Sequence, residues 1–327
     1  MPKELTHWIM ADRALAGLNS GSRLRELLLE HHDCYLGGAV LPDTLLHHVR
    51  GTHAKTALAL ARQFHDAAGN SFAPLIRAEQ CSPEGLPPST LACLLGVITH
   101  MQADIVFHPF VYALTGTAGI GRHYRLETDM DVHFLKGGAR LKVRHVADLM
   151  SPATRPVLVD TCALLFDPDG LLPRQELERA LALHCRFQGL YNRTFCKLAV
   201  RVAALLAGAP FREQQHLFYP LTRLRKDRFG DDAVEWRHPA SGEPRQTSLE
   251  QLAGDTVRRI VTLFDSIETG GSLADALIKS PGENLLSGMH GACMNVLETT
   301  WRPDGSGSAL TGGSDGSAIG CNCSKGI

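Results

Sequence analysis

Charge of one sign is what this sequence lacks most clearly. Its 33 lysines and arginines are balanced by 34 aspartates and glutamates, which leaves a formal net charge of −1 over 327 residues. A chain with so little excess charge has no general electrostatic attraction to nucleic acid or to anionic membranes. No apolar run reaches the roughly 18–20 residues of a membrane span. The N-terminus, MPKELTHWIMADR, lacks the basic segment and apolar stretch of a secretory signal.

A disulfide framework is absent as well. The nine cysteines are odd in number, and most stand singly among apolar residues, as Cys93 and Cys162 do. Isolated buried thiols are typical of a reducing compartment. We therefore expect a cytoplasmic protein with free cysteines.

Strand patterns are nearly absent, and no internal repeat is found. Segment 157–159 has the only local β preference, and residues 229–246 are interpreted as a polar loop. Apolar residues at helical spacing instead predict an all-α fold, with helices at 7–18, 23–32, 54–67, 88–110, 123–135, 174–184, 193–206 and 249–267. We expect one domain over residues 1–301, with a metal-ligand half at 1–150 and a helical remainder at 151–301. The Gly- and Ser-rich residues 302–327, which contain Cys321 and Cys323, are predicted to be a flexible tail.

The main candidate metal ligands lie within residues 96–110. This stretch reads as a buried helix that begins at the Pro87-Pro88 pair, and it carries His100, Asp104 and His108 at positions i, i+4 and i+8. Residues at this spacing lie on one stripe of a helix. Three polar groups on a buried stripe are costly without a compensating partner. A bound zinc ion is an economical partner, because imidazole and carboxylate are both good zinc ligands.

Further candidate ligands precede and follow this helix. His123 and Glu127 are one helical turn apart, a spacing common in metal sites. His7 lies at the start of the first predicted helix, and Asp43 ends the segment GAVLPD. His53 stands at the head of the helix over 54–67, with His47 and His48 as rivals upstream.

The ordered series of these residues resembles the zinc-dependent phospholipase C family, within the superfamily that also includes single-strand nucleases of the P1 type. The resemblance is carried by THWIMADRAL, GAVLPD, THMQADIVFHP and HYRLE, within residues 1–150. It implies an all-α helical bundle with a buried multi-zinc cleft and two or three Zn²⁺ ions. It also implies hydrolysis of a phosphoester such as a phospholipid or its head group. The near-neutral charge and the lack of a basic patch make nucleic acid the less favoured substrate.

Carried over by position, the resemblance implies three ligand sets. One zinc would take Asp43, His53, His100 and Asp104. A second would take His108, His123 and Glu127. A third would take His7, share Asp104, and use the N-terminal residue, a tryptophan in the family but Met1 or, after its removal, Pro2 here.

The chemistry of such a centre suggests two catalytic residues. Paired zinc ions neutralise the negative charge that builds on a phosphodiester under attack, and they lower the pKa of a bound water. We expect Asp104 to bridge two ions and Asp43 to orient or deprotonate the attacking water. Head-group specificity and oligomeric state are not encoded in any pattern we recognise.

Other functions compete with this one. His31-His32-Asp33 matches the dyad of a second class of all-α metal phosphohydrolases, although polar residues at a helix C-terminus explain it equally well. A nuclease-type hydrolase and a non-catalytic metal-binding or scaffold protein are the remaining alternatives.

Substituting His32 with alanine separates the two metal-enzyme hypotheses. If the dyad bound the metal, His32→Ala would abolish metal binding. We expect the variant to retain the metal content of the unmodified protein, measured by plasma emission after purification without chelator.

Overall fold

The computed structural model describes residues 3–116, 120–221, 229–230 and 232–291. Its helices confirm the all-α prediction. The first half contains α1 (Glu4–Gly17), α2 (Arg23–Glu30), α3 (His32–Gly38), η1 (Leu41–His47), α4 (Ala54–His65), α5 (Ala73–Gln80), α6 (Pro88–Thr115) and α7 (Ile120–Lys136). The second half contains η2 (Val146–Leu149), α8 (Thr154–Phe166), α9 (Arg174–Tyr191), α10 (Thr194–Leu206), α11 (Ala209–Gln214), η3 (Gln215–Leu217), α12 (Leu249–Gly270) and α13 (Leu273–Lys279).

Two local predictions were wrong. Segment 157–159 lies inside α8, because tertiary packing outweighs the β preference of its valines. The loop predicted over 229–246 contains β1 (Val234–Arg237), which pairs antiparallel with β2 (Pro244–Thr247). The predicted tail at 302–327 lies outside the described residues.

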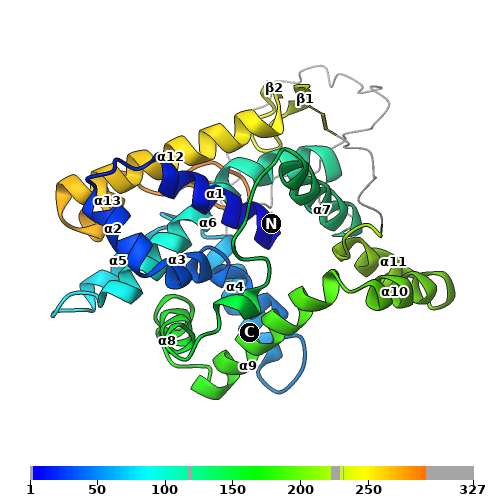
Figure 1. The fold of residues 1–327 in the computed structure, drawn as a ribbon, viewed down its shortest axis with the longest axis horizontal. Helices are drawn as coiled ribbons and strands as arrows, with labels where there is room; N and C mark the ends of the chain where they lie inside the picture. The colour runs from blue at the N-terminus through cyan, green and yellow to red at the C-terminus, as the bar shows by residue number, and fades with distance from the viewer. Residues whose placement is uncertain (1–2, 117–119, 222–228, 231, 292–327) are drawn as a thin grey trace, which may run out of the picture.

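Helix α6 runs through the interior of the molecule, where it contacts α1, α3, α7, α8 and α12 (Figure 1). It begins at Pro88 as predicted, since proline at the first helical position gives up no hydrogen bond. By length and composition it is the one described helix that passes the test for a membrane span, but 83% of its most apolar window is buried inside the fold. A helix apolar around its whole circumference and covered on all sides is a core helix.

Helices α3 and α6 cross at unusually short range, and glycines make this possible. A Cβ atom on Gly38 would lie 2.0 Å from the carbonyl oxygen of Cys93, and one on Gly96 would lie 2.0 Å from that of Tyr35. The contact brings the end of α3 beside the first half of α6, one turn before the first residue of the polar stripe, His100. The close approach of the two backbones therefore helps to fix the position of that imidazole.

A main hydrophobic cluster collects side chains from nearly every helix, from Leu5 to Leu285. A second cluster packs α7, β1 and the start of α12 against the other end of α6. Six described cysteines are free thiols. The polar stripe of α6 thus runs through the interior, with apolar packing at both of its ends.

Substituting Gly96 with alanine should destabilise the protein by about 2 kcal/mol or more, because the added methyl group meets backbone that cannot easily move. Gly254→Ala is the matched control: it lies in helix α12 with open space around its Cα, and we expect it to be neutral or stabilising by up to ~1 kcal/mol. Urea unfolding measures both. Equal stability of the two variants would show that the α3–α6 contact is not tight.

Candidate metal centre

The stripe of α6 is buried and polar, as predicted. His100, Asp104 and His108 are fully buried. Nδ1 of His100 donates to the carbonyl oxygen of Ala39 at 3.0 Å, and Nδ1 of His108 donates to that of Leu285 at 2.6 Å. A backbone acceptor on one ring nitrogen fixes the ring and turns the other nitrogen toward a ligand, which is the usual arrangement around a metal.

A further histidine, His65 at the end of α4, joins this stripe. Its Nδ1 donates to the carbonyl oxygen of Ala61 at 2.7 Å, so its Nε2 points the other way. That Nε2 lies 3.5 Å from Oδ1 of Asp43 and 3.9 Å from Oδ2 of Asp104. Nε2 of His100 lies 3.9 Å from Oδ1 of Asp43 and 3.2 Å from Oδ2 of Asp104. Four side chains from three segments therefore point at one small volume.

The separations fit a shared ion better than direct hydrogen bonds. Two ligands that each lie ~2.0–2.1 Å from a tetrahedral zinc ion are about 3.3 Å apart. Hydrogen bonds between nitrogen and oxygen are shorter, near ~2.9 Å. The distances among Asp43, His65, His100 and Asp104 run from 3.2 to 3.9 Å, nearer to the separation of two zinc ligands than to a hydrogen bond.

The same atoms have no hydrogen-bond partner. Among the described residues, the buried orphaned atoms include Oδ1 of Asp43, both carboxylate oxygens of Asp104, and Nε2 of His65, His100 and His108. A buried, unsatisfied polar atom costs about 1–3 kcal/mol, and a charged one costs more. So many in one place are consistent with a site built for a cation, and their nitrogen and oxygen chemistry suits zinc.

A second group of ligands lies beside the first. His108 on α6 faces His123 and Glu127 on α7, and one ligand atom from each lies within 4.8 Å of the others. Nε2 of His123 and Oε1 of Glu127 are 2.8 Å apart. Both residues are buried. The structure therefore brings together the set predicted for a second ion.

His7, on α1, is the remaining candidate ligand beside Asp104. It is buried, its Nε2 lies 3.7 Å from Oδ1 of Asp104, and both of its ring nitrogens are orphaned. Its ring stacks on that of His100 at 4.0 Å. Parallel rings direct their lone pairs side by side, which suits two neighbouring ions better than one. The predicted N-terminal ligand, Pro2, lies outside the described residues.

The start of α1 is held in place by a buried carboxylate on α7. Oδ1 of Asp131 accepts from the backbone nitrogen of Thr6 at 2.8 Å and from its hydroxyl at 2.6 Å. Oδ2 accepts from the hydroxyl of Tyr219 at 2.6 Å. Burial raises the pKa of Asp131 to about 6 despite these bonds. The network positions His7, the next residue after Thr6.

Burial and mutual charge adjust the protonation of the ligands. Burial, with the nearby His100, lowers the pKa of His7 well below its usual value, and burial with the nearby His123 does the same for His108. Both imidazoles are therefore neutral at pH 7, the form that binds metal. Burial alone would raise the pKa of Asp43, but the nearby imidazoles of His100 and His65 outweigh it and hold the pKa low. Burial alone would lower the pKa of His100, yet the carboxylates of Asp104 and Asp43 raise it.

The structure corrects one predicted ligand. His53 is the N-cap of α4, partly exposed, and it belongs to none of the described ligand groups. His65 stands in its place beside Asp43 and Asp104. The signal lay in the helix pattern, because Ala57, Ala61 and Phe64 define the buried face of α4 and His65 falls on that face. The rival His48 instead lies 2.6 Å from Glu176.

The alternative dyad does not form a metal site in the described part of the chain. Nε2 of His32 lies 3.5 Å from Oδ1 of Asp12, and both side chains are partly exposed. His31 separates α2 from α3. This geometry fits a solvated pair near a helix end.

A third polar group, missed by sequence reasoning, lies near the centre. Glu4, His47 and His184 have ligand atoms within 4.8 Å of one another. The two rings stack in parallel at 4.2 Å, with Nε2 of His184 lying 3.5 Å from Oε1 of Glu4. Burial, with the charge of His184, lowers the pKa of His47 to about 4. Parallel lone pairs do not converge on one ion, so we interpret the group as a polar wall.

A cleft of about 1350 Å³ opens over the metal centre. Its floor includes Asp43, His65, His108, His123 and Glu127. Its walls add apolar side chains, among them Leu46, Leu58, Leu183 and Leu190, and four arginines, Arg50, Arg62, Arg179 and Arg186. The cleft therefore combines ligand atoms for cations with positive charge and apolar surface.

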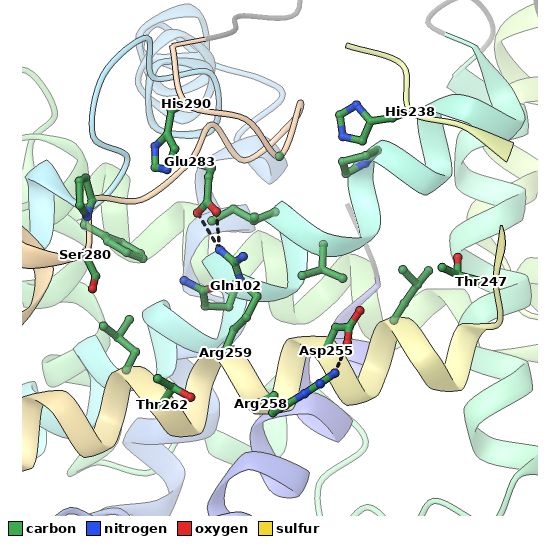
Figure 2. A pocket seen from close by; sticks show the side chains of 18 of the residues that line it. Gln102, His238, Thr247, Asp255, Arg258, Arg259, Thr262, Ser280, Glu283 and His290 are labelled. Carbon is green, nitrogen blue, oxygen red and sulfur yellow. Dashed lines mark hydrogen bonds and ion pairs between the residues drawn. The ribbon is translucent and has the colours of Figure 1, made fainter. Parts of the chain in front are cut away.

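A second cavity, of about 810 Å³, lies on another face of α6 and is lined by Gln102 and Val106 (Figure 2). Its charged groups already have partners: Arg259 donates to both carboxylate oxygens of Glu283 at 2.7 Å, and Arg258 pairs with Asp255. None of the candidate metal ligands lines it. We therefore place the functional site in the first cleft.

Comparison with known families agrees with this geometry. The family model described as zinc dependent phospholipase C matches residues 6–158, which contain every candidate ligand of the two groups and His7. This match confirms the resemblance predicted from the sequence. The comparisons with curated proteins and with solved structures found no match.

Alanine substitutions at His65 and His53 distinguish the observed geometry from the predicted one. We expect His65→Ala to lose zinc, because it removes a ligand atom next to Asp104. We expect His53→Ala to keep it. Plasma emission after dialysis measures both, with circular dichroism as the folding control. The reverse pattern would restore the original assignment of His53.

Proposed function

We propose that the chain is a zinc-dependent phosphodiester hydrolase of the phospholipase C type. The observation that carries the proposal is the convergence of orphaned imidazole and carboxylate atoms at the floor of a cleft. The family match supports a zinc-dependent hydrolase. Cytoplasmic location stays an expectation from the unpaired cysteines.

Each side chain has a role in this proposal. Asp43, His65, His100 and Asp104 would hold one ion. His108, His123 and Glu127 would hold a second, and His7 with Asp104 would contribute to a third. Zinc in such a centre lowers the pKa of bound water and neutralises charge on a phosphate group.

Asp43 is the candidate for orienting and deprotonating the attacking water. Its carboxylate is buried at the edge of the ligand group and lines the cleft, so it can contact both a ligand site and a substrate. Because its pKa is held low, it is ionised at pH 7 and ready to accept a hydrogen bond. Asp104 lies deeper, with histidines on several sides, and suits a bridging role.

The walls of the cleft favour a phospholipid or its head group as substrate. The arginines match the charge of a phosphate group, and the leucines match an acyl or glyceride portion. A single-strand nuclease would share the same zinc chemistry, and it is the second candidate because arginine also binds nucleic-acid phosphates.

Two aspartate variants test the proposal with a chromogenic phosphodiester after zinc reconstitution. We expect Asp104→Asn to lose metal and activity together. We expect Asp43→Asn to keep most of its metal while kcat falls by about 10²–10⁴-fold, the usual contribution of a general base. Asp255→Asn, in the second cavity, is the control and should retain full activity.

A fully loaded protein that hydrolyses no phosphoester would contradict the proposal and favour the scaffold alternative. A phosphocholine ester and single-stranded DNA, assayed in parallel, separate the lipid and nuclease substrates.

A further inference from the structure

Helix α10 presents an apolar stripe to the outside. Phe195, Leu198, Val202, Leu205 and Leu206 share one face at helical spacing, and all five are exposed. Phe195 is 80% exposed and Leu205 is 85% exposed. Single exposed apolar residues are ordinary, but a contiguous stripe of large ones marks an interaction surface.

The inward face of the same helix is polar where a core helix would be apolar. Lys197 is buried, and its Nζ donates to Oδ1 of Asn192 at 3.0 Å and to the carbonyl oxygen of Pro220 at 3.3 Å. Only Ala204 accompanies it among the buried residues of α10. These polar contacts fix the orientation of the helix. The stripe is therefore turned outward by specific bonds, contrary to the usual arrangement in a surface helix.

The charges next to the stripe in the sequence are positive up to Glu213, whose carboxylate accepts from the backbone nitrogen of Gly121 in α7. Residues 186–212 contain five cationic side chains and no acidic one, although the whole chain carries a net charge of −1. Four of the five are exposed: Arg186, Arg193, Arg201 and Arg212. A helix with an apolar stripe and only basic charges beside it is typical of segments that lie in the interface of an anionic bilayer.

Helix α10 lies in the chain between two segments that line the cleft. Helix α10 is connected on one side to Phe187, Leu190 and Tyr191, and on the other to residues 214–218, and both segments line the cleft. Exposed Ile120, at the start of α7, lines it as well. Figure 1 shows α10 and α11 at one end of the molecule, beside α7, and α2 and α13 at the other end.

We propose that α10 docks the protein on anionic lipid surfaces. Its apolar stripe would enter the interface, and the neighbouring arginines would contact acidic head groups. The docked helix would hold the cleft mouth next to the bilayer; this last step rests on the proposed phospholipase C function, whereas the docking itself does not. A second copy of the chain is the competing occupant, but two copies would bring like-charged arginine clusters together.

Cosedimentation of the full chain with vesicles tests the docking. The vesicles contain phosphatidylglycerol mixed into phosphatidylcholine, or phosphatidylcholine alone. We expect binding to the anionic vesicles that weakens with added salt. The double variant Phe195→Ser/Leu205→Ser should bind these vesicles at least about tenfold more weakly than the unmodified chain, because it removes two interfacial anchors.

The matched control is Leu171→Ser/Ile278→Ser, which changes two other exposed apolar residues and should bind like the unmodified chain. Both double variants should hydrolyse a soluble chromogenic diester at the unmodified rate. Absence of vesicle binding, equal binding by both double variants, or dimerisation in sedimentation that the Phe195→Ser/Leu205→Ser variant abolishes would overturn the proposal. Because cosedimentation needs no turnover, an inactive protein that still binds vesicles would refute the hydrolase function and support the docking.

Discussion

The structure depends on the placement of one carboxylate, Asp104, in the interior of its longest helix. Neither of its oxygens has a hydrogen-bond donor, and imidazoles from two other segments, α1 and α4, and from its own helix surround it. An ionised carboxylate in such a place is strongly unfavourable alone. Bound cations would convert the cost into an attraction that holds α1, α4, η1 and α6 together. Metal binding and folding are linked in this way in other metal proteins.

Contacts elsewhere in the fold fix the histidines that surround Asp104. The glycines at the α3–α6 crossing bring Ala39 to the Nδ1 atom of His100. Asp131 holds the start of α1, and with it His7. The chain near Leu285 returns to accept from His108. The candidate metal ligands all come from the first part of the sequence. The carbonyl oxygen that fixes the ring of His108 comes from Leu285, near the end of the described chain. The second half of the fold therefore also helps to build the site.

The sequence predicted most of this centre because helical spacing is a local property. His100, Asp104 and His108 lie on one helix, as do His123 and Glu127, so their mutual placement follows from period alone. Asp43 and His7 were placed by family resemblance. The prediction named His53, at the head of its helix, with His47 and His48 as rivals, and missed His65 on the buried face of the same helix. The wall formed by Glu4, His47 and His184 joins residues from distant segments, and no local pattern encodes such a contact. The net charge of the whole chain gave no sign of the basic segment around α10, because acidic residues elsewhere in the sequence balance its charge.

The most direct test of the central claim is anomalous diffraction from crystals of the zinc-loaded protein, recorded on both sides of the zinc absorption edge. We expect one peak among Asp43, His65, His100 and Asp104, and another among His108, His123 and Glu127. Zinc peaks elsewhere, or a cavity at Asp104 that holds only water after zinc loading, would contradict the claim that cations bring these residues together.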